Sequence, residues 1–351
     1  MPVRMKDIAR NLGVSVVTVS KVLHNHHDIS DETKQRVLAK MKELHYRPHL
    51  AARSLVTGRS FIIGLVVPDL VYSFFSEISL GMTRVLRELG YGLILTSSEE
   101  DPELEARAIE EMLARRVDAI VVASCQPSAA TINSIVEQGI PYVLVDRGFD
   151  GTPSNFVGAD DVRIGEMATQ HLVDIGRQRI AHIAHPQVST SFRRMEGYKN
   201  VLARNRIMPV GQYLVSVAHG AEAADRNGYE AMKILLRSKP RPDAVFCFND
   251  PAAYGAMQAI LEAGLRIPED IAIIGCGNLR YSEYLRIPLS SVDQSSQRLG
   301  EEAARLALAV VKSGHPPEPQ TVLIEPRLVI RDSTLPTANT PVRAVTSQRE
   351  K

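Results

Sequence analysis

The chain has 351 residues, enough for two or three domains, and its 41 Lys and Arg nearly balance its 40 Asp and Glu to give a formal net charge of +1. No run of about 18 apolar residues occurs, which excludes a membrane-spanning helix. The near-neutral total hides a basic end: residues 1–60 hold 11 basic and 5 acidic side chains, whereas the remainder holds 30 and 35. Such a basic end is typical of a domain that binds nucleic-acid phosphates.

The sequence also indicates where the protein works. The N-terminus lacks the apolar stretch of a signal peptide, so we expect a cytoplasmic protein. Cys125, Cys247 and Cys276 lie within or beside apolar runs at spacings that match no metal motif. We interpret them as buried, reduced thiols and expect no metal and no other cofactor.

The basic end begins with a short helical pattern, "MKDIARNLG". Ile8, Ala9 and Leu12 recur at the spacing of one helix face. Gly13 follows, and glycine most readily adopts the left-handed conformation that ends a helix. The sequence therefore predicts a first helix that ends at a turn.

The next stretch, "GVSVVTVSKVLH", contains five valines, which by propensity favour a strand. However, Val19, Val22 and Leu23 repeat the helical spacing, and Ser15 stands where a hydroxyl can cap the first free amides. We therefore predict a second helix. Two helices that meet at a glycine-containing turn form a helix-turn-helix, whose second helix enters the DNA major groove.

A third helix is predicted from Ser30, in the capping sequence "SDET", to about Leu44. Its inward-facing residues are predicted to be Val37, Leu38, Met41 and Leu44. Residues 1–47 thus form a predicted DNA-binding headpiece. The alternative is a helical hairpin packed on a larger domain.

The segment "HYRPHLAARSLVTGRS" then separates the headpiece from the rest of the chain. "HLAARSL" is compatible with a helix of only about two turns, which is marginal in water on its own. We interpret residues 48–59 as a linker whose helix folds only when something holds it.

Beyond Gly58, short apolar strands alternate with amphipathic helices, as in "FIIGLVV", "YGLILT", "DAIVVAS", "PYVLVD", "RIAHIA", "DAVFCF" and "IAIIG". This alternation predicts an α/β fold of parallel sheets with helices on both faces, and so many strands predict two doubly wound lobes. The core is predicted at 60–332, with one lobe at 60–157 and 290–320 and the other at 158–289 and 321–332. The polar residues 333–351 are predicted to be disordered.

The order of these pieces resembles the LacI/GalR (lactose-repressor-type) family of bacterial transcription regulators. The likeness covers about residues 3–332 and is carried by "MKDIARNLGVSVVTVSKVL", "ISDETKQRVLAKMKELHYRPHLAARSL", "IIGLVVPDL", "GIPYVLVDR", "HLVDIGRQRIAHI", "RRMEGYKNVL", "FCFNDPAAYGAMQAILEAGLRIPEDIAIIG" and "PLSSVDQ". The resemblance implies a homodimeric repressor with a hinge helix that folds on a palindromic operator. It also implies a periplasmic-binding-protein-like core that senses a small molecule, which we expect to be carbohydrate-like.

By position, Val16, Val17 and Lys21 match the family's base-reading side chains. An exposed valine methyl can contact a thymine methyl, and Lys21 can donate to guanine or to a phosphate. The alternative is that one valine is partly buried and Lys21 only adds charge. The predicted DNA-binding set is Ser15, Val16, Val17, Thr18, Ser20, Lys21, Asn25 and Leu55.

Leu55 matches the hinge leucine that the family wedges into the minor groove at the operator centre, opposite the second copy in the dimer. We expect Leu55→Ala to weaken operator binding far more than non-specific DNA binding. Equal losses of the two would contradict this assignment.

For the sensor site, polar residues at strand ends match family effector contacts and suit ligands rich in hydroxyl groups. The predicted set is Phe74, Phe75, Asp146, Arg147, Arg193, Arg194, Asn249, Asp250, Asn278 and Gln294. Phe74 and Phe75 could equally be ordinary core, and the sequence leaves open which of Arg193 and Arg194 points inward. Gly277 stands where relatives usually carry an aspartate, for which Asn278 is a candidate substitute.

Two other functions are alternatives to a ligand-controlled repressor. An α/β enzyme finds support in "IIGCGNLR", which is similar to a dinucleotide-binding loop but lacks the third glycine. A solute-binding protein would suit the second half of the chain but leaves the headpiece unexplained. A dimer is favoured over a tetramer because the tail has no heptad repeat. The sequence does not decide whether the ligand induces or co-represses.

Overall fold

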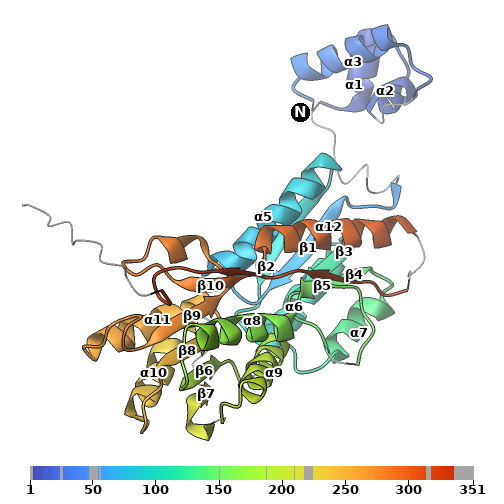
Figure 1. The fold of residues 1–351 in the computed structure, drawn as a ribbon. Helices are drawn as coiled ribbons and strands as arrows, with labels where there is room; N and C mark the ends of the chain where they lie inside the picture. The colour runs from blue at the N-terminus through green and yellow to red at the C-terminus, as the bar shows by residue number, and fades with distance from the viewer. Residues whose placement is uncertain are drawn as a thin grey trace, which may run out of the picture. The chain divides into compact units, whose positions relative to one another are not determined.

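The computed structural model describes residues 3–23, 27–46, 54, 57–149, 151–186, 188–208, 210–216, 224–313 and 318–335. The chain divides into two compact units, Met1–Ser60 and Phe61–Lys351, which are described separately (Figure 1). Among the described residues, every helix is too short or too polar to cross a membrane.

The first unit contains three helices, α1 (Met5–Leu12), α2 (Val16–Leu23) and α3 (Asp31–Glu43). The turn between α1 and α2 is formed by Gly13, at φ 63°, and by Ser15, whose Oγ accepts a hydrogen bond from the Thr18 amide at 2.9 Å. The valine-rich stretch is therefore helical, as its periodicity predicts.

A small core holds the three helices together. Its buried members are Ile8, Ala9, Val19, Val22, Val37 and Met41. The prediction for Leu38 is wrong, since this side chain is 54% exposed. Val37 and Met41, four residues apart, form the buried stripe of α3. Leu38 follows Val37 directly and is therefore rotated by about 100° around the helix axis from Val37, towards solvent.

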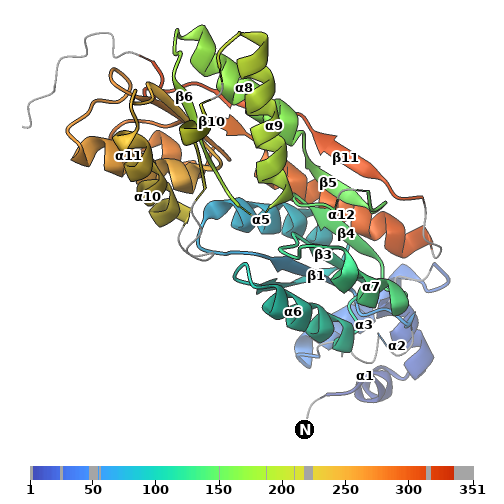
Figure 2. The same ribbon diagram turned by 90° about the horizontal axis from the view of Figure 1, so that it is seen from below.

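The second unit contains two six-stranded sheets with helices on both faces, in agreement with the predicted fold class (Figures 1 and 2). The first sheet is all parallel, in the order β11-β5-β4-β3-β1-β2. Its strands are β1 (Ile62–Val67), β2 (Gly92–Ser97), β3 (Ala119–Val122), β4 (Tyr142–Val145), β5 (Phe156–Ala159) and β11 (Thr321–Ile324).

Alternation along the strands decides which helices cover each face of this sheet. In β1, Ile63, Leu65 and Val67 pack with the helices of one face, whereas Val66 packs with those of the other. The first face carries α5 (Ser73–Glu88) and α12 (Ser296–Ser313), and the second carries α6 (Pro102–Ala114) and α7 (Ala130–Glu137).

The second sheet has the order β12-β10-β9-β8-β6-β7 and is parallel except for the antiparallel pair β10 and β12. Its strands are β6 (Ile180–Ala184), β7 (Leu214–Ser216), β8 (Ala244–Cys247), β9 (Ala272–Cys276), β10 (Ser290–Asp293) and β12 (Arg327–Val329). One face packs against α8 (Asp161–Asp174) and α9 (Ser189–Arg204), and the other packs against α10 (Ala224–Arg237) and α11 (Asp250–Glu262). The short 3-10 helices are η1 (Gly211–Tyr213) and η3 (Arg280–Glu283).

The chain passes between the two sheets three times, between β5 and α8, between β10 and α12, and between β11 and β12. Each passage is only one or two residues long, so the two sheets and their helices form two lobes joined by short adjacent segments. The predicted boundaries placed β10 in the first lobe and β11 in the second, which the strand order contradicts. Each crossing lies a few residues later than predicted, because both strands pair with their own sheet before the chain leaves it.

The end of the core also lies beyond its predicted limit. Ser333 and Thr334, assigned to the disordered tail, are buried. The Ser333 Oγ donates to the Ile273 carbonyl at 2.6 Å and accepts from the Ser290 amide at 2.8 Å. Polar composition misled the prediction here because these hydroxyls are satisfied internally. The rest of the predicted tail, residues 336–351, lies outside the described residues.

Candidate effector pocket and nucleic-acid interface

The start of α2 presents an exposed pair of valines. Val16 is 43% exposed and Val17 is 63% exposed, whereas Val19 is fully buried in the headpiece core. Apolar groups left in water at the N-terminus of a second helix are suited to thymine methyl groups in a major groove. Val17 is mostly exposed, whereas Val16 is partly covered, so the alternative in which one of these two valines is partly buried stays open.

The polar members of the predicted DNA-binding set lie around these valines. Ser15 is exposed, and Thr18, Ser20 and Lys21 are half-buried. The Ser15 and Thr18 hydroxyls lie 2.9 Å apart, and the Lys21 ammonium forms an ion pair with Asp28. The ion pair uses one of the three N–H donors of the Lys21 ammonium, so the others can donate to a phosphate or a base. Asn25 and Leu55 lie outside the described residues.

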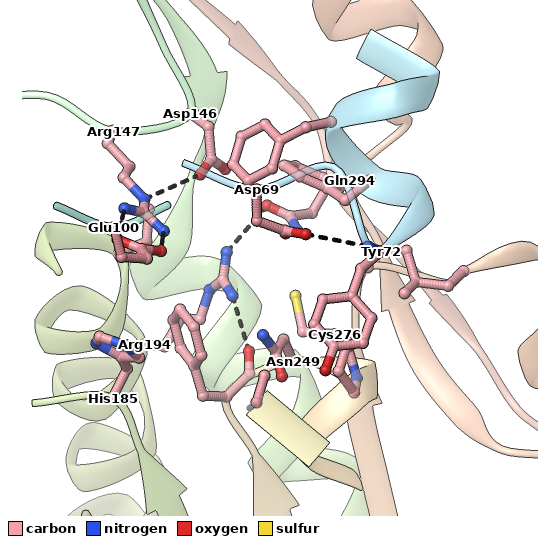
Figure 3. Close-up of a pocket in the computed structure, with 18 of the residues that line it drawn as sticks. Asp69, Tyr72, Glu100, Asp146, Arg147, His185, Arg194, Asn249, Cys276 and Gln294 are labelled. Atoms are coloured by element: carbon pink, nitrogen blue, oxygen red, sulfur yellow. Dashed lines mark hydrogen bonds and ion pairs between the residues drawn. The ribbon is translucent and has the colours of Figure 1, made fainter. Parts of the chain in front are cut away.

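A pocket lies at the carboxyl ends of strands from both sheets of the second unit (Figure 3). In doubly wound sheets this edge is where ligands bind. The structure brings seven of the ten predicted effector residues to its wall: Phe74, Phe75, Asp146, Arg147, Arg194, Asn249 and Gln294.

Arg194, on α9, is the arginine that points inward. It is buried, and its Nε donates to Asp161 Oδ1 at 2.8 Å while Nη2 donates to Gln294 Oε1 at 3.0 Å. Its guanidinium also lies over the Phe248 ring, 4.8 Å from the centroid. Arg193 is exposed and lines a separate groove. The choice left open by the sequence thus falls to Arg194.

Asp146 and Arg147 follow β4 and lie at the pocket with Glu100, from the loop after β2. Arg147 Nη1 and Nη2 donate to the two carboxylate oxygens of Glu100 at 2.7 and 2.6 Å. Burial opposes ionisation of Glu100, but the charge and hydrogen bonds of Arg147 outweigh it and lower the pKa of that carboxyl. Arg147 Nε has no hydrogen-bond partner among the described residues and lies 3.9 Å from Asp146.

Asp250 and Asn278 do not line this pocket. Asp250 is fully buried and accepts hydrogen bonds from Ser291 Oγ at 2.6 Å, the Leu279 amide at 2.7 Å and Ser282 Oγ at 2.8 Å. Asn278 accepts a hydrogen bond from Arg331 Nη2 at 2.8 Å. Both therefore hold the second lobe together, because each side chain is engaged by its neighbours.

Asn249, in contrast, faces the pocket while its Oδ1 caps α11 through the Ala252 amide at 2.9 Å. This arrangement leaves the Asn249 amide nitrogen as the group it can offer to a ligand.

Gly277 lies at the pocket wall with φ 123°, a conformation that side chains rarely adopt. An aspartate at this position would therefore be strained in the present backbone. Since Asn278 turns away to Arg331, it does not replace the missing carboxylate.

Several wall residues were missed by sequence reasoning: Asp69, Tyr72, Glu100, His185, Thr190 and Asn227. Asp69 follows the first predicted strand, so the rule that polar residues gather at strand ends could have found it. Asn227 lies within α10 and carries no such signal. Its buried Oδ1 has no hydrogen-bond partner among the described residues.

The comparisons with known proteins agree with this architecture. Residues 4–49 match the model of bacterial regulatory proteins of the lacI family, and residues 60–332 match that of periplasmic binding proteins and the sugar-binding domain of the LacI family. The HTH-type transcriptional repressor PurR of Mannheimia succiniciproducens is 33% identical over 332 residues, which cover 94% of this chain and 98% of that protein. The ribose operon repressor of Escherichia coli K12 is 34% identical, over 85% of this chain and 90% of that repressor.

Among solved structures, the Lac repressor dimer bound to operator and the anti-inducer ONPF superposes with a TM-score of 0.83 at 26% identity. The match covers 95% of this chain and all of that one. A CelR–cellobiose complex superposes with a TM-score of 0.72 at 27% identity, over 94% of this chain and 99% of that one. The chain belongs to the LacI family of bacterial regulatory proteins.

Proposed function

We propose that this protein is a transcriptional repressor that binds a palindromic operator as a homodimer and responds to a small molecule bound between its two lobes. The observation that carries this proposal is the joint presence, in one chain, of a helix-turn-helix with exposed valines and a strand-end pocket walled by both lobes. Such a regulator acts on DNA, which places it in the cytoplasm.

In this proposal α2 enters the major groove. Val16 and Val17 contact thymine methyl groups, and Ser15, Thr18, Ser20 and Lys21 contact phosphates or base edges. The similarity to a Lac repressor dimer bound to operator supports two headpieces acting on two half-sites. Leu55 keeps the minor-groove role that the family resemblance implies, and Asn25 stays a member of the proposed DNA-binding set.

A ligand bound in the pocket controls DNA binding in this proposal. Its wall includes Asp146 and Arg147 from the first lobe and Arg194 from the second. A ligand that contacts both lobes stabilises one lobe arrangement over another and so shifts the population of the DNA-competent state. Because each 1.4 kcal/mol changes affinity tenfold, about two such increments would give a hundredfold response.

The effector is proposed to be carbohydrate-like. Among similar proteins, one is named a ribose operon repressor and another was solved as a cellobiose complex. Here Phe74 and Phe248 line the pocket with aromatic rings, and Asp146 and Asn249 line it with polar groups. A sugar presents both an apolar ring face and hydroxyl groups, which suits this combination.

The family assignment argues against the enzyme alternative, and the structure explains the glycines that suggested it. In "IIGCGNLR", Gly275 leaves room for the Asp250 side chain, which a Cβ at this position would strike. This glycine therefore serves packing within the second lobe and is not evidence of a dinucleotide loop. The attached headpiece likewise argues against a plain solute-binding protein.

The test is a selection of genomic DNA fragments by the full-length protein near physiological salt, followed by sequencing. The selection is run with and without a small-molecule extract of the host. We expect an enriched palindrome with a flexible pyrimidine-purine step at its centre, and its enrichment changes when the extract is present.

A matched headpiece variant controls for non-specific DNA binding. Val17→Ala should lower the enrichment of the palindrome while it retains bulk DNA binding, because the basic side chains are unchanged. No palindrome under either condition would contradict operator recognition. A palindrome insensitive to a broad metabolite panel would contradict effector control.

A further inference from the structure

Both guanidinium groups at the effector pocket are already matched by carboxylates of the protein. Arg147 is held by the two oxygens of Glu100, and Arg194 is held by Asp161. Each arginine is buried. A bidentate pair uses the paired donors with which arginine would otherwise bind a phosphate or carboxylate of a ligand.

Acceptors, in contrast, are left over around the pocket. The Asp146 carboxylate lies 3.9 Å from Arg147 Nε, beyond hydrogen-bonding distance, and the buried Asn227 Oδ1 has no hydrogen-bond partner among the described residues. Asp69 uses one carboxylate oxygen to accept from the amides of Val71 and Tyr72, at 2.6 and 3.1 Å. The pocket therefore keeps unused acceptors, whereas its two guanidinium charges are balanced by carboxylates of the protein, and the donors that remain, such as the Asn249 amide nitrogen and Arg147 Nε, are separate groups that do not form a bidentate pair.

The backbone conformation of the loop after β2 fixes the position of Glu100. Glu99 and Glu100 have φ values of 52° and 58°, which are uncommon for residues other than glycine. The Glu100 amide donates to the Pro68 carbonyl at 3.1 Å, and the Asp101 amide donates to the Ser98 carbonyl at 2.8 Å. A backbone conformation maintained against its intrinsic preference is typical of functional sites.

We propose that Glu100 determines the specificity of the pocket by occupying Arg147, so that the effector is a hydrogen-bond-donating molecule without a phosphate or carboxylate group, such as an unmodified sugar. This inference rests on the proposed function, because it concerns the effector of the same site. It assigns to Glu100 a role that no sequence motif in the chain indicates. Figure 3 shows Glu100 and Arg147 joined at one side of the pocket.

The variant Glu100→Gln should expose Arg147 to anionic ligands. An amide cannot balance the Arg147 charge or accept both of its hydrogen bonds, so the guanidinium becomes available to an external anion. The probe is inorganic phosphate, titrated by calorimetry into the full-length protein at constant ionic strength. We expect Glu100→Gln to bind phosphate saturably and at least tenfold more tightly than the wild type.

Two variants control this measurement. Glu99→Gln makes the same change of charge at the adjacent, exposed residue and should bind phosphate as the wild type does. The double variant Glu100→Gln with Arg147→Gln should lose the gain, since the anion then has no guanidinium. Phosphate bound by the basic headpiece is common to all four proteins and therefore cancels in the comparison.

The outcomes are decisive for Glu100 in either direction. The proposal is overturned if Glu100→Gln binds phosphate no more tightly than the wild type does. Should Glu100→Gln fail to fold, the wild type is titrated with D-ribose, D-glucose and their 5- and 6-phosphates. Tighter binding of either phosphate than of its parent sugar then overturns the proposal, and no preference for the phosphates supports it.

The same set of proteins separates this proposal from the proposed function. Operator binding is measured by the fragment selection and does not depend on phosphate binding at Arg147. Loss of operator recognition with the phosphate gain retained contradicts the repressor assignment alone. An intact, extract-sensitive operator response without the gain contradicts only the role of Glu100.

Discussion

At the scale of single residues, Asp161 is the group whose ionisation matters most to the second lobe. It is buried at the start of α8 and bonded to Arg194 Nε. Burial raises its pKa to about 7, although the charge of Arg194 works in the opposite direction. The guanidinium has further acceptors in the Phe248 carbonyl and Gln294, so it remains charged while the carboxyl is easily protonated.

This pKa predicts how the stability of the core depends on pH. Between the ordinary aspartate pKa near 4 and about 7, the folded state binds more protons at Asp161 than the unfolded state does. The contribution of this group to the free energy of unfolding therefore falls as pH rises through that window, by at most about 1.4 kcal/mol per pH unit. Urea unfolding of Asp161→Asn from pH 4.5 to 8 should show that this slope is lost.

The control for this prediction is Asp174→Asn, the same chemical change at an exposed carboxylate near the end of α8. It should keep the wild-type slope. At pH 8, where the Asp161 carboxyl of the wild type is ionised, Asp161→Asn should be the less stable protein, since Arg194 then loses its counter-charge. An unchanged slope in Asp161→Asn would show that another group carries the pH dependence.

The valines of α2 allow a second residue-scale prediction. Val17→Ala should weaken operator binding about three- to tenfold and change headpiece stability by less than about 0.5 kcal/mol, because its methyl groups are exposed. Val19→Ala, two residues away, should cost about 2 kcal/mol of headpiece stability, because its side chain is fully buried. Circular dichroism unfolding and fluorescence anisotropy with the selected operator measure the two effects. Equal changes at both positions would contradict the division of α2 into a core face and a DNA face.

Residue-level prediction from the sequence succeeded where position in an element determines the role. Val19 and Val22 are buried and Val17 is exposed because helical periodicity puts Val17 on another side of α2, and Val16 is exposed as the first residue of that helix. The same reasoning failed for Asp250, a polar residue at a strand end whose carboxylate is engaged by Ser291 and Ser282. It also missed Glu100, because only the folded chain brings the loop after β2 beside Arg147.

At the scale of elements, three helix pairs pack unusually closely through glycines. The pairs are Gly81 with Gly300 on α5 and α12, Gly165 with Gly197 on α8 and α9, and Gly228 with Gly255 on α10 and α11. A Cβ at any of these positions would overlap the backbone of the facing helix. Each pair covers one face of a sheet, so the glycines set the spacing of the helices that frame the pocket.

The α8–α9 pair is the one that bears on the site, since it carries Asp161 and Arg194. A Cβ at Gly165 would overlap the Arg194 carbonyl oxygen. Gly165→Ala should therefore separate the helices, destabilise the core by about 1–3 kcal/mol and weaken the effector response of operator binding. Gly211→Ala, where a Cβ meets nothing within 4 Å, is the control and should change neither quantity measurably. Equal stability of the two variants would contradict close packing at this crossing.

Element order was largely predictable, but the assignment of elements to lobes was not. Strands such as β1, β4 and β8 can be recognised in the sequence as short apolar runs, because parallel strands are buried on both faces. β10 and β11 are also short, and nothing in their composition states which sheet they join. Their pairing with β9 and β5 is a long-range property that only the folded chain reveals.

At the scale of the whole second unit, the lobes are joined by three short passages and by a side-chain contact at the pocket. Tyr72, just before α5 of the first lobe, donates a hydrogen bond from its hydroxyl to Asp225 Oδ1 on α10 of the second lobe at 3.1 Å. Burial raises the pKa of Tyr72 to about 12, so the hydroxyl keeps its proton at neutral pH. Because Tyr72 also lines the pocket, this bond links lobe closure to the site that the effector occupies.

Removal of this bond should favour separation of the lobes. A net contribution of about 1 kcal/mol for one hydrogen bond predicts that Tyr72→Phe exchanges backbone amides at the starts of α5 and α10 about fivefold faster than the wild type. Hydrogen–deuterium exchange by mass spectrometry measures this, and Tyr281→Phe, at a 68% exposed tyrosine, is the matched control.

A host extract that alters operator binding should restore slow exchange in Tyr72→Phe, because a ligand that contacts both lobes replaces the lost link. Identical exchange in both variants would mean that the short passages alone hold the lobes together and that Tyr72 contributes only to the pocket wall.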